Sequence, residues 1–248
     1  VTIMRGGCTV VEGAESATMG ESSLARAMVG DALEKGLGRS DMASKPAGES
    51  RLVLENVVLK RSDGSLALNS VNMEVRSGEI VGVAGVGGNG QTELTEVIYG
   101  MVEANSGHII IDNRDLSHLS IKQRREQGLR LVPADRFDYA LLPDMRAYEN
   151  LAITEVPHGR FGSLWLLSRR RMKQHARAIF SSREITGGEP MTLTRLLSGG
   201  NAQKLLLGRE LDTQAAILVA HSPTRGLDVR ACQVVHQSIT ENVQKGTA

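Results

Sequence analysis

Two glycine-rich segments of the sequence carry residue types that can bind phosphate. The first reads Gly85-Val86-Gly87-Gly88-Asn89-Gly90-Gln91-Thr92 and lies between an apolar run and a segment of helical character. Glycines in such a place let backbone N–H groups surround a phosphate at a helix N-terminus. An unliganded glycine-rich turn is an equally good interpretation of this segment alone. If the segment does bind phosphate, we expect the contacts from Gly85, Gly88, Asn89, Gly90, Gln91 and Thr92.

The same segment departs at one position from the phosphate-loop pattern G-x-x-x-x-G-K-[ST]. Gly85, Gly90 and Thr92 fit the pattern, but Gln91 stands where the pattern has lysine. A glutamine side chain donates hydrogen bonds to phosphate oxygens but brings no positive charge. The segment therefore predicts a phosphate loop with weakened attraction for the β- and γ-phosphates.

The second segment, Leu197 to Lys204 (LSGGNAQK), precedes another helical run. Ser198 suits the N-cap of that helix, and Gly199 and Gly200 leave its first backbone N–H groups accessible. A hydroxyl, exposed amides and the positive end of a helix dipole form an anion site. An ordinary capped helix explains Ser198 but not the two glycines and Asn201 beside it.

Composition limits the kind of protein that carries these segments. The 248 residues include 41% hydrophobic residues, enough for one large domain with a small appendage. The net charge of +1 and the 3% of aromatic residues favour no nucleic-acid partner. Cys8 and Cys232 lie too far apart in sequence for a metal-like spacing. We find no apolar run near the ~20 residues that span a bilayer.

Strands and helices are expected to alternate along the chain from about residue 51. Residues 80–84 and 215–220 are continuous apolar runs, which suit buried parallel strands. Further strands are expected at 52–54, 57–59, 66–75, 108–112 and 129–132, and helices at 91–99, 121–127, 200–211 and 229–243, with residues 148–185 mainly helical. Residues 1–12 suggest two short strands around an Arg-Gly-Gly turn. The alternation predicts an α/β fold.

The order of the motifs resembles that of the ATPases of ABC transporters. LSGGNAQK is similar to their signature sequence, in the form typical of importers of simple sugars and nucleosides. Residues 216–228 (AILVAHSPTRGLD) resemble the Walker B strand and D-loop, residues 131–136 (LVPADR) the Q-loop region, and residues 82–94 (GVAGVGGNGQTEL) the phosphate loop of a second nucleotide-binding domain. The resemblance covers roughly residues 51–243.

The resemblance implies a P-loop NTPase fold of the ABC-ATPase type, with an antiparallel β subdomain and an inserted helical subdomain at about 137–198. Residues 1–30, with a short helix expected at 21–30, resemble the end of a preceding nucleotide-binding domain, and residues 31–50 read as a linker. The nucleotide-binding domain itself is expected to be 51–248, without its C-terminal H-loop region.

Several positions where the family has catalytic groups hold other residues here. Gln91 replaces the lysine, His221 the Walker B aspartate, Ser222 the adjacent glutamate and Ala134 the Q-loop glutamine. We find no aromatic residue near Arg61 and Ser62 to stack on adenine. Their joint loss leaves little electrostatic stabilisation for phosphoryl transfer. His221 could be read as a metal ligand, but no second ligand has suitable spacing, so no metal site is expected.

The resemblance also implies how the intact signature would work. In this family two nucleotide-binding domains pack head to tail, and each ATP lies between one phosphate loop and the other domain's signature. The signature residues here would act on the partner domain's ATP, and Asp228 of the D-loop would help to position that site. ATP and Mg²⁺ are thus expected mainly at the partner site. The signature residues are Ser198, Gly199, Gly200, Asn201 and Gln203.

The implied function is that of the energy-coupling subunit of an importer for nucleosides or simple sugars, peripheral on the cytoplasmic face of the membrane. Its partners would be the second nucleotide-binding domain and a permease that docks near residues 134–150. Two alternatives stay open: a soluble ABC protein acting in translation or regulation, and an inert truncated fragment. The isolated chain is expected to be inactive as an ATPase. Arg169-Arg170-Arg171 is most simply a solvated helix start.

Overall fold

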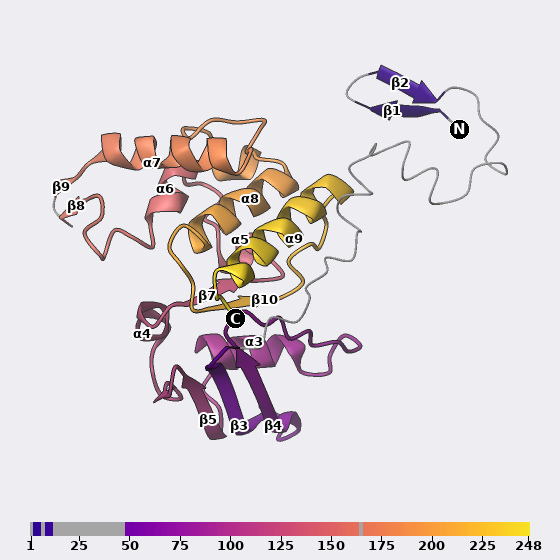
Figure 1. The fold of residues 1–248 in the computed structure, drawn as a ribbon, viewed down its shortest axis with the longest axis vertical. Coiled ribbons are helices and arrows are strands. Elements are labelled where there is room, and N and C mark those ends of the chain that lie inside the picture. The colour runs from indigo at the N-terminus through magenta and orange to yellow at the C-terminus, as the bar shows by residue number, and fades with distance from the viewer. Residues whose placement is uncertain (1, 6–7, 12–47, 164–165) are drawn as a thin grey trace.

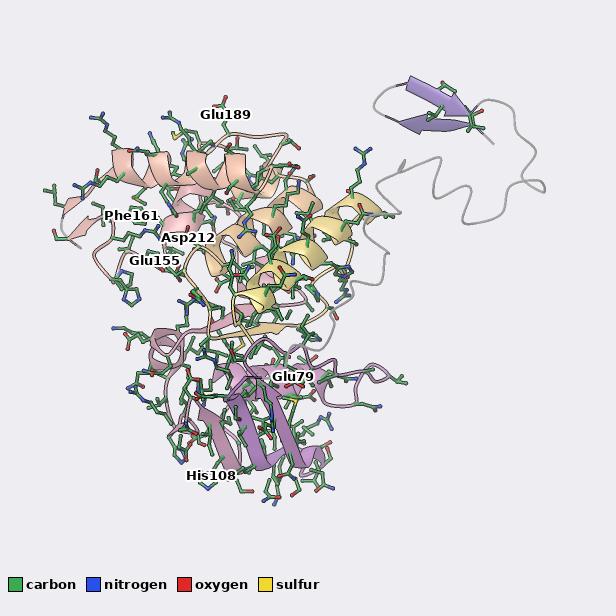
Figure 2. The ribbon with its side chains drawn as sticks, viewed as in Figure 1. Glu79, His108, Glu155, Phe161, Glu189 and Asp212 are labelled. Atoms are coloured by element: carbon green, nitrogen blue, oxygen red, sulfur yellow. The ribbon has the colours of Figure 1, made fainter. Side chains whose placement is uncertain are left out.

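The computed structural model describes residues 2–5, 8–11, 48–163 and 166–248. From residue 48 onward the chain forms an antiparallel sheet with one helix, a pair of parallel strands, and a layer of helices (Figure 1). The parallel pair lies between the other two parts. His108 on the sheet and Glu189 beyond the helices mark opposite ends of this arrangement (Figure 2).

The antiparallel sheet has the strand order β4-β3-β5-β6. The two strands expected around Glu55 and Asn56 form one continuous strand, because Asn56 takes a positive φ of 49° where the register with β4 shifts. Apolar residues from the sheet pack with the buried end of helix α3. The bounds are β3 Ser50–Lys60, β4 Leu66–Arg76, α3 Gln91–Tyr99, β5 Ser106–Ile111 and β6 Arg114–Asp115.

The parallel pair consists of β7 (Leu129–Val132) and β10 (Ile217–Ala220), and both strands are as the sequence predicts. Their register runs from Ile217 opposite Leu129 to Ala220 opposite Val132. The pair separates two hydrophobic cores, one shared with the antiparallel sheet and one with the helices. The carboxyl ends of both strands therefore reach the same edge, which is where ligands bind in open α/β sheets.

The helical layer is built around α8, whose residues from Ala202 to Glu210 are almost all buried. The expectation that residues 148–185 are mainly helical is confirmed for α6 and α7, although a short β8–β9 hairpin interrupts them. The bounds of the remaining elements are α4 Ile121–Glu126, α5 Arg136–Tyr139, α6 Ala147–Ala152, β8 Gly162–Ser163, β9 Leu166–Leu167, α7 Arg169–Ser182, the 3₁₀ turn η2 Thr194–Leu196, α8 Gly199–Glu210 and α9 Val229–Gln244.

The prediction of a buried strand at residues 80–84 is wrong. Ile80 is 51% exposed and Val83 is 55% exposed, and the segment is not a strand. Among the described residues, none forms a backbone hydrogen bond with residues 80–85. A strand needs a hydrogen-bonded neighbour, and β10 instead bonds to β7 on one edge and to Ala248 on the other. Residues 80–84 therefore have the composition of a strand but not its hydrogen-bonded neighbour.

The first residues pair as expected, because β1 (Ile3–Arg5) and β2 (Cys8–Val11) form an antiparallel hairpin. The short helix expected at 21–30 and nearly all of the linker expected at 31–50 lie outside the described residues. Within the described part of the chain, none of the helices combines the length and the apolar character needed to cross a bilayer.

Candidate functional site

A cavity of about 270 Å³ lies at the carboxyl ends of β7 and β10, beside the start of α3. The two strand ends are joined there by a backbone hydrogen bond, in which His221 N donates to Val132 O at 2.8 Å. The cavity brings together four positions that the sequence analysis singled out. The lining includes Thr92, Ala134, His221 and Ser222, together with Thr95, Glu96, Met101, Leu131, Pro133, Asp135, Tyr139 and Arg225.

The phosphate loop lies at the N-terminus of α3, and its glycine requirement is physical. Gly90 has a φ of 97°, and a Cβ there would lie 2.6 Å from Ala67 O on β4. Gln91 Nε2 donates to Val86 O at 3.3 Å, and this amide also occupies the space that a side chain at Gly85 would need. The amide of Gln91 thus bonds within the loop, whereas a lysine would bring charge to a phosphate.

The residues around the cavity do not fit a magnesium-dependent hydrolytic centre. Magnesium prefers oxygen ligands that include carboxylates, whereas β10 is followed by the imidazole of His221 and the hydroxyl of Ser222. The cavity has two carboxylates, but Asp135 Oδ1 already accepts hydrogen bonds from the backbone of Phe137 and Asp138. In the described ranges no cluster of three or more His, Cys, Asp or Glu side chains could hold a metal ion. No step of ATP hydrolysis can be assigned to this cavity.

The region expected to face adenine also lacks an aromatic surface. Arg61, on the turn after β3, forms an ion pair with Glu93 of α3 at 2.7 Å. The Arg61 hydrogen bond contributes to lowering the pKa of the Glu93 carboxyl, after the larger effect of a backbone hydrogen bond at Glu93 itself. The charges of Arg61 and Glu93 therefore offset each other in the region where an aromatic side chain would be expected to stack on adenine.

The signature segment forms an accessible helix tip. Ser198 is the exposed N-cap of α8, and its Oγ accepts from Asn201 N at 3.4 Å and from Asn201 Nδ2 at 3.0 Å. Within the described part of the chain, the backbone N–H groups of Gly199 and Gly200 donate no hydrogen bond. Two free N–H groups at the positive end of a 12-residue helix are able to bind an anion. We call Ser198 to Asn201 the signature tip.

Gln203, which is expected to act with the signature residues, lies in the core behind the exposed start of α8. Its side chain is buried at 2% exposure, and its Nε2 donates to Pro223 O at 2.8 Å. One helical turn after the tip, a glutamine points into the core rather than along the helix axis. Gln203 therefore links α8 to the segment that follows β10.

Asp228 lies next to the signature tip, where it caps another helix. Its Oδ1 accepts from Ala231 N at 2.9 Å at the start of α9. A Cβ on Gly200 would lie 3.9 Å from Asp228 Oδ2 and 3.0 Å from Ala231 Cβ. The two helix starts therefore pack closely, and this contact limits the size of the residue at position 200.

A buried ionic cluster, which the sequence analysis missed, joins the signature helix to the phosphate-loop helix. Glu210 on α8 is 1% exposed and accepts from Arg125 at 2.8 Å and from Arg209 at 2.9 Å. Arg125 also donates to the hydroxyl of Tyr99 at the end of α3, at 2.7 Å. Burial raises the pKa of the Tyr99 phenol. The only sequence signal was a pair of charged residues, Arg209 and Glu210, within an otherwise apolar stretch.

Comparison with known proteins identifies the family. The family model described as "ABC transporter" matches residues 68–225, so the chain belongs to the ABC transporter ATP-binding family. The glucose import ATP-binding protein TsgD13 of Haloferax volcanii is 36% identical over 100% of this chain and 44% of its own length. The guanosine import ATP-binding protein NupO of Bacillus subtilis is 33% identical over 92% of this chain and 44% of its own. The chain thus spans less than half the length of these relatives.

Solved structures agree on the fold. A nucleotide-free ATP-binding cassette from an ABC transporter has a TM-score of 0.68 at 24% identity, over 80% of this chain and 79% of that one. A dimeric cassette in a post-hydrolysis state with ADP and phosphate has a TM-score of 0.67 at 24% identity, over 79% of this chain and 85% of that one. The predicted fold, a P-loop ABC cassette with an antiparallel sheet, is confirmed. Cassettes of this family bind ATP with Mg²⁺ in general.

Proposed function

We propose that this chain is a nucleotide-binding domain that couples ATP to import and that donates its signature tip to ATP held by another nucleotide-binding domain. The observation that carries the proposal is the exposed start of α8, with an intact Ser198-Gly199-Gly200-Asn201 sequence and two unpaired backbone N–H groups. A γ-phosphate presented by a second domain would meet these groups. Asp228, packed against Gly200, would fix the geometry of the contact.

The chain's own cavity is proposed to be non-hydrolytic. Gln91, Ala134, His221 and Ser222 lie at or around it without supplying a lysine or a carboxylate next to β10. Gly85, Gly88, Asn89, Gly90 and Thr92 would at most hold a nucleotide by backbone N–H groups and a hydroxyl. Turnover would then occur only at the site completed by the signature tip, where the partner domain supplies Mg²⁺ and the catalytic groups.

The partners and the cargo are inferred from relatives. The names of TsgD13, NupO and the nucleoside import protein NupA of Lactococcus lactis describe import of glucose, guanosine and nucleosides. We infer that this chain works with a second nucleotide-binding domain and with transmembrane permease subunits at the cytoplasmic face of the membrane. The cargo class is a nucleoside or a simple sugar, and the permease selects among them.

The division of the chain is likewise a proposal. Residues 1–30 are assigned to the end of a preceding nucleotide-binding domain, 31–50 to a linker and 51–248 to the domain discussed here. The match with NupA takes in 100% of this chain but 48% of that protein, which leaves room in such a protein for a second nucleotide-binding domain.

The test measures ATPase activity of this chain joined to a nucleotide-binding domain whose phosphate loop has its lysine. Ser198→Arg places a bulky cation on the signature tip and should lower the rate at least about 100-fold, because the γ-phosphate loses its contacts. Ser168→Arg is the matched control, since Ser168 caps α7 in the same way. Undiminished turnover by Ser198→Arg would contradict the proposal. The chain alone should show no Mg-ATP hydrolysis above background.

A further inference from the structure

An arginine that the family motifs leave without a role lies against the signature tip. Arg136 is the first residue of α5, just after the segment that lines the cavity beside β7. A Cβ on Gly199 would lie 2.9 Å from Arg136 Nη2. The guanidinium thus occupies the space beside the first residue of α8, and a side chain at position 199 would have to displace it.

The guanidinium has no counter-charge where it lies. Its Nε is shielded from solvent and has no hydrogen-bond partner. Among the described residues no carboxylate comes within ion-pair distance of Arg136, although Asp228 is close to the neighbouring Gly200. The carboxylate just before it, Asp135, is engaged with the backbone of α5. A shielded nitrogen without a partner is uncommon for arginine, which presents five donors.

The position of this charge favours an anion beside it. The N-terminus of α8 carries the positive end of a helix dipole and two free N–H groups. A cation beside that end is repelled, whereas a phosphate between the guanidinium and the N–H groups is attracted by both. Arginine is also the side chain whose planar donors match phosphate oxygens in pairs.

We propose that Arg136 is a phosphate-binding residue of the signature tip, supplied by the segment after β7 of the same domain. It acts on the terminal phosphate of the nucleoside triphosphate that the Gly199 and Gly200 N–H groups contact. This inference rests on the proposed function, because it adds a charged contact to the signature tip. It also connects the cavity-lining segment 133–135 directly with the site of the partner's nucleotide.

The experiment follows the backbone amide signals of the isotope-labelled chain by NMR while inorganic triphosphate or ATP is added. The signals of Gly199 and Gly200 should move with both probes and much less with AMP. Arg136→Ala should raise the dissociation constant read from these signals about tenfold, because one charged hydrogen-bond donor is lost. Arg136→Lys should restore part of the affinity. Arg170→Ala is the matched control, since that arginine is exposed on α7 and does not line the cavity.

The outcomes separate this inference from the proposed function. If Gly199 and Gly200 respond to triphosphate equally well in the unmodified chain and in Arg136→Ala, the role of Arg136 is refuted while the signature tip keeps its ligand. If these signals respond in neither protein and only the phosphate loop responds, the role of Arg136 is refuted, and the ATPase activity of Ser198→Arg in the joined protein decides the proposed function separately. An equal loss in Arg170→Ala would also refute the specific role of Arg136, because it would show a general effect of charge.

Discussion

The signature tip and the phosphate loop have the same local design, a glycine-rich turn that opens a helix, yet the two helix starts differ in what surrounds them. At the signature tip the first N–H groups of α8 are unpaired and Arg136 lies beside them. At the phosphate loop the side chain of Gln91 bonds back to Val86 O within the loop. A helix N-terminus attracts an anion in both cases, so the neighbours decide which start is used.

The two regions are also mechanically connected. The path runs from Tyr99 at the end of α3 through Arg125 to Glu210 near the end of α8. Arg209 continues it to Ala140 O, in the segment that follows α5. A rigid link of this kind can hold the cavity and the signature tip in fixed relation.

Glu210→Ala should have the largest effect. The substitution leaves Arg209 and Arg125 without their shared carboxylate in a largely buried place, which costs about 3–5 kcal/mol of unfolding free energy. Urea unfolding followed by circular dichroism measures the loss. Glu189→Ala is the control, because Glu189 is exposed at the outer edge of the helical layer (Figure 2) and forms no ion pair among the described residues. A loss below about 1 kcal/mol, typical of a surface pair, would show that the cluster is not a structural link.

A pair of glycine substitutions compares the two helix starts directly. Gly90→Ala forces a side chain into a φ of 97° and against Ala67 O, which should cost about 1–3 kcal/mol. Gly199→Ala should stay within about 1 kcal/mol of the unmodified protein, because the group it meets is the flexible end of Arg136 and alanine favours the helix. Both values come from urea unfolding. Equal losses of unfolding free energy in Gly90→Ala and Gly199→Ala would contradict this comparison. They would show that the backbone constrains both helix starts to the same extent.

Much of this arrangement could be predicted from the sequence because it depends on local patterns. The N-cap at Ser198 and the strands β7 and β10 follow from residue type and apolar runs, and the structure confirms them. The order of the motifs also pointed to the family before any coordinates were known. Local physics is enough wherever a residue's role depends on its immediate neighbours in the chain.

The failures concern contacts between distant segments. Residues 80–84 have the composition of a buried strand, but a strand also requires an edge to pair with, and composition does not report one. The bond from Gln203 to Pro223 O is likewise a contact between distant segments that residue type alone does not indicate. The meeting of Arg136 with Gly199 joins positions 63 residues apart (199 − 136), so no spacing rule could have indicated it.

The smallest expected effect concerns the phosphate loop itself. Gln91→Lys should raise the affinity of the chain's own cavity for ATP about tenfold, because an added positive charge attracts the phosphates and releases the bond to Val86 O. Titration with a fluorescent ATP analogue measures the change. Gln237→Lys adds the same charge on the exposed face of α9 and should leave the affinity unaltered. Hydrolysis should stay absent in Gln91→Lys, since His221 and Ser222 still supply no carboxylate. If the affinity for ATP does not rise, the backbone conformation of the loop, and not the absence of the lysine charge, limits phosphate binding there.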